Sequence, residues 1–192
     1  MKIGVLALQG DFIEHQKIME GLGAKVSQVR LPSDLDSLQG LVIPGGESTT
    51  IGKLAVDFDL MEPLRSFARE HPVWGTCAGS IFLSKDASRH QPLLGLMDIK
   101  VERNAFGRQV DSFEINLDIP CLKKVSDENA PFHAVFIRAP LIESVGKDVQ
   151  VLASLPDGRI IAAQEDHWLA TSFHPELTGD TRFHRYFLEM IP

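Results

Sequence analysis

The stretch VWGTCAGSI, residues 73–81, decides how this chain folds. An apolar run ends at Cys77, and the residues around that cysteine are small. The form Gly-x-nucleophile-x-Gly predicts a strand that turns sharply into a helix, with the nucleophile at the apex. The sulfur of Cys77 would then lie near a helix N-terminus, whose partial positive charge favours the thiolate. The alternative interpretation is a small cysteine that only packs in the core.

Strand and helix signals alternate in the first half of the chain around this turn. We expect strands over residues 3–8, 24–31, 40–46 and 72–76. We expect helices over residues 12–22, 33–39, 47–54 and 60–71, the first of them capped by Asp11. This order predicts an α/β fold of three layers, with a mostly parallel central sheet and helices on both faces. Reactive groups in such folds gather beyond the carboxyl ends of the strands.

The second half of the chain has a different pattern. Alternating apolar and polar residues with few helix signals predict additional antiparallel strands over residues 93–117, 134–145, 149–155 and 159–173. The Asp-Gly pair in PDGR, residues 156–159, indicates a hairpin turn. Residues 178–191 are expected to form a closing helix. We expect residues 1–192 to form a single domain.

Composition and charge exclude several function classes. Hydrophobic residues make up 44% of the 192 and the formal net charge is −7, so a basic surface for nucleic acid or anionic membrane is not expected. No apolar run approaches the roughly 18 residues of a membrane span. The two cysteines, Cys77 and Cys121, lie too far apart in sequence for a C-x-x-C pair. Neither a disulfide scaffold nor a zinc site is expected, and the cytoplasm is the predicted compartment.

A candidate base for Cys77 lies in TSFHPEL, residues 171–177. Residues two apart in an extended segment point the same way, and Pro175 favours an extended backbone before it. Glu176 is therefore predicted to accept a hydrogen bond from one ring nitrogen of His174, leaving the other nitrogen free to act as a base. A solvated loop histidine is the alternative. The other six histidines are assigned no chemistry, and His15, whose helix follows a strand end, is the nearest competitor.

The third element is PGGES, residues 44–48, a glycine turn at a strand end. Backbone N–H groups of such a turn can face a ligand and, together with the N–H of Ala78, could form an oxyanion hole. A plain tight turn is the alternative. The stretch lacks the G-x-x-x-x-G-K-[ST] pattern of a phosphate-binding loop.

Together PGGES, GTCAG and FHPE resemble the motifs of the class I glutamine amidotransferases. Further stretches, at residues 3–15, 101–114, 136–140 and 171–180, are similar to one branch of that family and spread the resemblance over nearly the whole chain. The resemblance implies that Cys77 is the nucleophile, His174 the general base and acid, and Glu176 the group that orients His174. It places the oxyanion hole at the N–H groups of Gly46 and Ala78. The glutamine-binding positions that it implies are Gly46, Glu47, Ser48, Arg103, Ile137 and Arg138.

The implied activity is hydrolysis of L-glutamine to L-glutamate and ammonia through a thioester, with no metal or organic cofactor. A domain of this size leaves no room for a synthase, so the resemblance implies a separate synthase chain that receives the ammonia through a closed path. The Gly45–Gly46 peptide could flip at little steric cost. An oxyanion hole that forms only when the partner docks is therefore a further hypothesis.

Three other functions stay open at the level of sequence. A cysteine peptidase-like hydrolase is one, although such relatives tend to carry a histidine directly after the nucleophile, where this chain has Ala78. A non-catalytic regulatory subunit is the second. The third is the glutaminase of another amidotransferase, such as imidazole glycerol phosphate synthase, and only RNAFGRQ, residues 103–109, argues against it. Residues 89–100 and 122–132 carry no motif that assigns a role.

Overall fold

The computed structural model describes residues 1–88, 90–103, 112–128 and 130–192. Within these residues the chain forms a ten-stranded sheet and a separate two-stranded sheet. The strands are β1 (Lys2–Leu6), β2 (Lys25–Val29), β3 (Gly40–Ile43), β4 (Val73–Thr76), β5 (Ser84–Asp86), β6 (Met97–Glu102), β7 (Ser112–Leu117), β8 (Phe132–Ile137), β9 (Leu141–Val145), β10 (Gln150–Ser154), β11 (Ile160–Glu165) and β12 (Trp168–Thr171). The α-helices are α1 (Phe12–Gly21), α2 (Ser48–Asp57), α3 (Met61–Glu70), α4 (Ala78–Leu83) and α5 (Arg182–Glu189).

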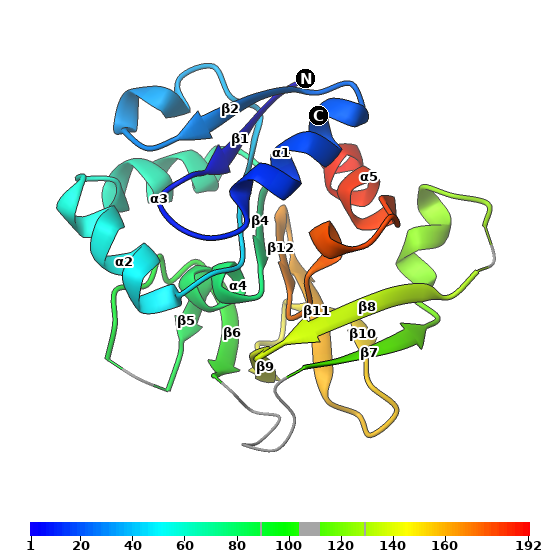
Figure 1. Cartoon of the computed structure of the whole chain (residues 1–192). Helices are drawn as coiled ribbons and strands as arrows, with labels where there is room; N and C mark the ends of the chain where they lie inside the picture. The colour runs from blue at the N-terminus through cyan, green and yellow to red at the C-terminus, as the bar shows by residue number, and fades with distance from the viewer. Residues whose placement is uncertain (89, 104–111, 129) are drawn as a thin grey trace.

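The large sheet has the order β2-β1-β3-β4-β12-β11-β9-β6-β5, with β10 paired to β11. Neighbours from β2 to β12 in this order are parallel, as the alternation of strands and helices predicts. Helices lie on both faces, with α2, α3 and α4 toward one side of the parallel strands and α1 and α5 toward the other (Figure 1). The predicted three-layer α/β fold is therefore confirmed.

Two hydrophobic cores separate the layers, and the pleat of the strands divides their side chains between them. Leu41 and Ile43 of β3 enter the core beneath α2 and α3, whereas Val42, between them, enters the core beneath α1 and α5. All three side chains are fully buried. Burial of successive side chains on opposite faces is expected for a strand that is covered by helices on both sides.

Two local expectations in the first half need correction. The sequence predicts a helix over residues 33–39, but the helix there is a 3₁₀ turn, η1 (Pro32–Leu35), whose Asp34 carboxylate accepts the N–H groups of Arg30 and Leu31. Asp11 stands at the N-cap position of α1, yet its side chain makes no capping hydrogen bond. A different contact of that carboxylate is described below.

The second half is antiparallel in part. Strands β9 and β11, β6 and β9, and β7 and β8 pair antiparallel, and Gly158 has the positive φ of the predicted hairpin turn before β11. Strand β12 departs from the expectation, since it is antiparallel to β11 but parallel to β4 on its other side. The physical reason is burial, because Leu169 and Ala170 are both fully buried and need a covered central position.

The closing helix is α5, and the Asp180 carboxylate accepts the N–H of Arg182 at its start. A second 3₁₀ turn, η2 (Pro120–Lys124), precedes β8, and a third, η3 (Pro175–Leu177), follows β12. In the part of the chain that the structure describes, no helix is both long enough and apolar enough to cross a bilayer.

Candidate active site

Cys77 occupies a strained turn between β4 and α4. Its φ of 46° lies in the left-handed region that non-glycine residues avoid, and its N–H donates to the carbonyl of Thr171 at 2.8 Å. A Cβ on Gly75 would lie 2.5 Å from the carbonyl oxygen of Gly79, and a Cβ on Gly79 would collide with Ile43. The turn therefore requires these glycines, and the predicted nucleophile elbow is confirmed as a structure.

The pairing of β4 with β12 brings the two halves of the site together. Thr76 is the register partner of Thr171, so Cys77 and His174 follow the carboxyl ends of adjacent parallel strands. The side chains of Cys77 and His174 both pack against Gly45, and the interaction with Cys77 raises the pKa of His174. Both residues are buried, with 6% and 5% of their surface exposed, and both line the same pocket. Cys77 therefore borders a cavity beside His174, although most of its surface is buried.

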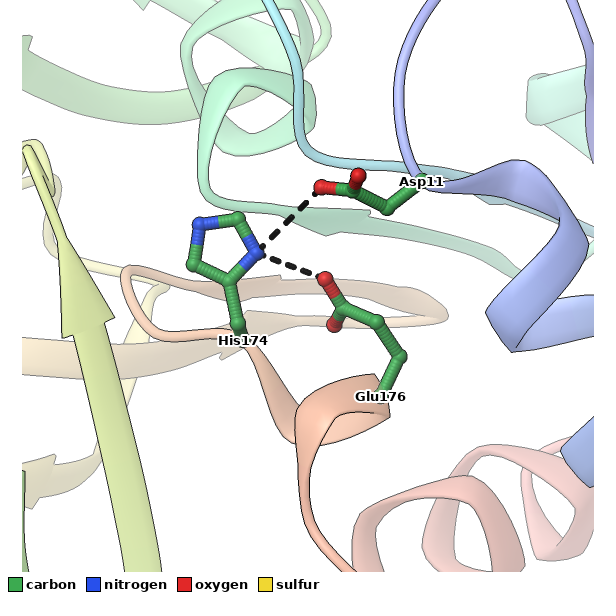
Figure 2. Close-up of side chains that lie close together, drawn as sticks. All are labelled: Asp11, His174 and Glu176. Atoms are coloured by element: carbon green, nitrogen blue, oxygen red, sulfur yellow. Dashed lines mark hydrogen bonds and ion pairs between the residues drawn. The ribbon is translucent and has the colours of Figure 1, made fainter.

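Glu176 binds the other nitrogen of the His174 ring. His174 Nδ1 lies 2.6 Å from Glu176 Oε1, and the ring points its second nitrogen away from this carboxylate (Figure 2). The predicted pair is present, but the predicted reason is wrong, because Pro175–Leu177 form η3 rather than an extended segment. Pro175 stands at the first position of that turn, where its fixed φ and missing N–H are tolerated.

The charges of this pair reinforce each other. Burial alone would lower the pKa of His174, but its hydrogen bonds with Cys77 and Glu176 outweigh burial and raise the pKa to about 10. Burial alone would raise the pKa of Glu176, but its contacts with His15 and His174 outweigh burial and lower the pKa to about 2. Both directions favour an imidazolium beside a carboxylate, which is the state that a thiolate at Cys77 requires.

A second carboxylate faces the same nitrogen. Asp11 Oδ2 lies 3.6 Å from His174 Nδ1 (Figure 2). Burial and the charge of Glu176 raise the pKa of Asp11. The ligand atoms of these three residues lie within 4.8 Å of one another, close enough to hold a cation. A cation there would have to displace the hydrogen bond between His174 Nδ1 and Glu176, so it would compete with the pair described above.

The glycine turn after β3 packs directly against the cysteine and the histidine. A Cβ on Gly45 would lie 2.6 Å from His174 Cε1 and 3.3 Å from Cys77 Cβ. The loop before α1 fixes this turn from outside, since the N–H of Asp11 donates to the Gly45 carbonyl at 3.1 Å and Gln9 Oε1 accepts the N–H of Glu47 at 2.6 Å. A Cβ on Gly10 would collide with the same carbonyl. This turn is therefore held by a backbone hydrogen bond from Asp11, a hydrogen bond to the side chain of Gln9, and close packing against Gly10.

A pocket of about 490 Å³ opens over Cys77. Five of the six predicted glutamine-binding residues line it, together with the predicted oxyanion residue Ala78; those five are Gly46, Glu47, Arg103, Ile137 and Arg138. Ser48 is the exception, because its buried hydroxyl is hydrogen-bonded to Gln91, which leaves only its backbone for a ligand. Arg138 has a φ of 43°, a second strained residue beside the pocket.

The side chain of Glu47 has local partners as well. Its carboxylate accepts the N–H groups of Thr49 and Thr50 at the start of α2 and forms an ion pair with Arg103. Burial alone would raise the pKa of Glu47, but the hydrogen bonds from Thr49 and Thr50 and the charge of Arg103 outweigh it and lower the pKa. Most of the RNAFGRQ stretch, residues 104–109, lies outside the described residues, so the structure describes Arg103 alone among its members.

Sequence reasoning missed two residues next to this site. His15 and His184 are both fully buried and lie behind Glu176, although the sequence assigns them no chemistry. A helical signal for His15 existed, because it shares the inward face of residues 12–22 with Met19.

The second cysteine, Cys121, does not line the pocket that opens over Cys77. Burial raises the pKa of Cys121 to about 11, so its thiol stays protonated near neutral pH.

A parallel sheet that carries a cysteine elbow beside a histidine–glutamate pair is the architecture of a glutamine amidotransferase. A solved structure described as "Crystal structure of glutamine amidotransferase" matches this chain with a TM-score of 0.90 and 46% identity, covering 98% of this chain and 97% of that one. The chain belongs to the SNO glutamine amidotransferase family, whose model matches residues 5–192. The resemblance drawn from the motifs is therefore confirmed.

Curated relatives narrow the comparison. A protein of Herpetosiphon aurantiacus named "Pyridoxal 5'-phosphate synthase subunit PdxT" is 61% identical, over 98% of this chain and 99% of its own. A protein of Desulforamulus reducens with the same name is 57% identical over the full length of both. The motifs at residues 3–15 and 101–114 also resemble the glutaminase subunit of pyridoxal 5′-phosphate synthase. The structure of PurLQS from Thermotoga maritima, 15% identical with a TM-score of 0.68, shares the fold.

Proposed function

We propose that this chain hydrolyses L-glutamine to L-glutamate and ammonia and is the glutaminase subunit of a pyridoxal 5′-phosphate synthase. The single observation that carries the proposal is the geometry around Cys77. A cysteine at a strained elbow packs beside a histidine whose far nitrogen is held by a buried glutamate. The relatives that match over nearly the whole chain bear the name of that synthase subunit, which supports the choice of pathway.

The first half of the reaction is acyl transfer to sulfur. The thiolate of Cys77 attacks the side-chain amide carbon of glutamine, and the amide oxygen becomes an oxyanion. The N–H groups of Gly46 and Ala78 would stabilise that charge, each donor being worth about 10²–10³ in rate. The imidazolium of His174 gives its Nε2 proton to the amide nitrogen, the C–N bond breaks, and ammonia leaves a thioester on Cys77.

The second half is hydrolysis of that thioester. Neutral His174 takes a proton from a water molecule, whose oxygen attacks the thioester carbon. The oxyanion forms again in the same place, the C–S bond breaks, and glutamate is released. The thiolate and the imidazolium are regenerated, so the cycle balances without a metal or a redox step. Glu176 keeps the Nδ1 proton of His174 in place throughout.

The charges around the pocket suit an amino-acid substrate. Glutamine carries an α-carboxylate and an α-ammonium group, and charge-assisted hydrogen bonds to these two groups are the strong ones. We assign the carboxylate to the guanidinium of Arg138 or Arg103 and the ammonium to Glu47. Ile137 is a partly exposed side chain beside these charges and gives the aliphatic part of the substrate an apolar contact.

The experiment that tests the reaction compares the two cysteines. Cys77→Ser is expected to lower glutamate release from glutamine by about 10⁴-fold or more, because the nucleophile is lost. The matched control, Cys121→Ser, removes a thiol outside the site and is expected to keep the wild-type rate. A diazoketone analogue of glutamine should label Cys77 once per chain, and glutamine should block the labelling. Activity retained in Cys77→Ser, or hydrolysis of peptides but not of glutamine, would overturn the proposal.

The partner is tested by co-purification with a pyridoxal 5′-phosphate synthase chain. We expect a stable complex and a faster glutaminase reaction within it. The hypothesis of a flipping Gly45–Gly46 peptide gives the reason, because a flip breaks the hydrogen bond from Asp11 N–H to the Gly45 carbonyl and needs a driving contact. Equal rates of glutamate release with and without the synthase chain would exclude that hypothesis, and failure to form any complex would exclude the partner.

A further inference from the structure

A row of buried polar side chains continues behind Glu176, away from Cys77. His15 Nε2 on α1 lies 3.3 Å from Glu176 Oε2, and His15 Nδ1 lies 3.0 Å from His184 Nε2 on α5. His15, His184 and Thr76 are fully buried, and Glu176 has 6% of its surface exposed. Such groups are costly to bury, so a cluster of them in one core needs an explanation.

Glu176 has two oxygens with different surroundings. Oε1 accepts the hydrogen bond from His174 Nδ1, whereas Oε2 is inaccessible to water and has no well-aligned hydrogen bond among the described residues. The contact of Oε2 is His15 Nε2. A carboxylate oxygen cannot face the lone pair of a ring nitrogen without repulsion, so His15 Nε2 must carry a proton. Thr76 Oγ1, 3.2 Å from the same nitrogen, is close enough to share it.

The next contact fixes the other end of the His15 ring. Burial and the neighbouring His15 lower the pKa of His184 well below its ordinary value, so His184 is neutral and carries one proton. Its Nδ1 has no partner among the described residues. Placing the proton of His184 on Nε2 lets it donate to His15 Nδ1 and leaves only a lone pair unpaired, which costs less than an unpaired buried N–H. The indole of Trp74 packs edge-on against both rings.

We propose that His15 is a positioning residue for the glutaminase reaction, one whose protonated Nε2 lies 3.3 Å from Glu176 Oε2 and holds that carboxylate in place beside His174. His184 is its second support, since it fixes which His15 nitrogen carries the proton. The inference rests on the proposed function and extends its triad by one member. Other charges near His15 are those of Asp11 and Glu176, and both favour a donor at this place.

A histidine that only fills space would behave differently. An apolar side chain of similar size is often tolerated or stabilising where a buried polar group has no functional task. If His15 instead supports Glu176, its loss leaves a buried carboxylate oxygen without a donor, which makes protonation of Glu176 easier. Activity then disappears at a higher pH on the acidic side, because only the ionised Glu176 can hold the Nδ1 proton of His174.

The test compares His15→Leu with His15→Gln in the full-length chain. Leu removes the donor, and Gln keeps an amide N–H near the position of Nε2. We expect His15→Leu to lower kcat by about 10–100-fold, the range typical of groups that orient a functional side chain, with KM within about twofold of wild type. The acidic limb of the pH profile of kcat should move to higher pH in His15→Leu. His15→Gln should restore most of the rate and return the acidic limb to its wild-type position. His71→Leu, on a histidine that packs against Phe67, is the matched control and should change neither.

A second readout does not depend on glutamine. The rate of Cys77 alkylation by iodoacetamide is measured against pH, and its midpoint should rise in His15→Leu and return in His15→Gln. A wild-type chain that labels but releases no glutamate would refute the proposed function and leave this comparison decisive. The inference would be overturned if His15→Leu left both the acidic limb of the activity profile and the midpoint of the alkylation curve unchanged. A fall in the thermal stability of the variant would not rescue the inference, because that result describes a purely structural residue.

Discussion

The two sides of Cys77 are built by different means. On one side lie the glycine turn after β3 and the loop before α1, where absent Cβ atoms and backbone hydrogen bonds set the distances. On the other side lie His174, Glu176 and His15, where the positions of protons set the contacts. The first side should respond to added volume and ignore pH. The second should respond to a change of charge that leaves volume untouched.

The largest expected effect comes from Glu176→Gln, which changes the charge of the second side at nearly constant volume. The amide can present its N–H to His174 and so favour the wrong tautomer. We expect kcat for glutamate release to fall by about 10⁴-fold, as when a triad carboxylate is made an amide. The pKa of His174 should also fall, because a hydrogen bond and a charge that raise it are lost.

The same variant has a signature in folding. The pKa of Glu176 is lowered from 4.5 to about 2, so its contribution to stability is present above pH 4.5 and disappears as the pH falls toward 2. Urea unfolding between pH 5 and pH 2 should show this loss in wild type and not in Glu176→Gln. Glu70→Gln, on the exposed end of α3, is the control. If Glu176→Gln kept glutaminase activity within tenfold of wild type, the contrast drawn between the two sides of Cys77 would be wrong.

The next largest effect is expected for Gly10→Ala. This substitution adds volume on the first side, at the glycine turn after β3, and changes no charge. The new Cβ collides with the Gly45 carbonyl, and the φ of 106° is itself unfavourable for alanine. Displacing the turn should misplace an oxyanion donor and cost about 10²–10³ in kcat, with limbs of the pH profile unmoved. Gly21→Ala on α1, where nothing lies within 4 Å of the new Cβ, is the control and should keep activity. A Gly10→Ala profile with shifted limbs would show that the two sides are coupled.

The smallest effect is expected for Asp11, which belongs to both sides. Its N–H holds the Gly45 carbonyl, while its carboxylate faces His174 Nδ1. Asp11→Asn keeps the backbone contact and removes only the charge, so we expect a loss of about 2–5-fold, the size of one partly exposed charge contact. The alkaline limb should move slightly to lower pH. A loss as large as that of Gly10→Ala would mean that the new amide side chain also disturbs the turn.

Local signals were enough to predict much of this structure. The apolar run and small residues around Cys77 predict a turn whose geometry depends only on its neighbours. The pair of His174 and Glu176 was also predictable, because two residues that close in sequence can meet in several backbone conformations. The extended segment argued for them was wrong, yet the 3₁₀ turn allowed the same hydrogen bond.

Non-local packing explains what the sequence did not reveal. The pattern of residues 168–171 predicts a strand but cannot say that β4 is its parallel neighbour. His15 and His184 are 169 residues apart, and they meet only because α1 and α5 pack on the same face of the sheet, over Trp74. Ser48 shows the same limit, since its motif fits a ligand contact but does not reveal that its hydroxyl is hydrogen-bonded to Gln91; glutamine binding by its backbone stays a prediction.

The place of β12 between β4 and β11 has a consequence for synthesis of the chain. A ribosome-bound polypeptide that stops before Trp168 already contains the elbow of Cys77, but it lacks both the imidazole and the strand whose Thr171 carbonyl accepts the N–H of Cys77. Under the proposed mechanism such a nascent fragment has no base for glutamine hydrolysis. The site would be completed only when translation has delivered the segment that fills the middle of the sheet.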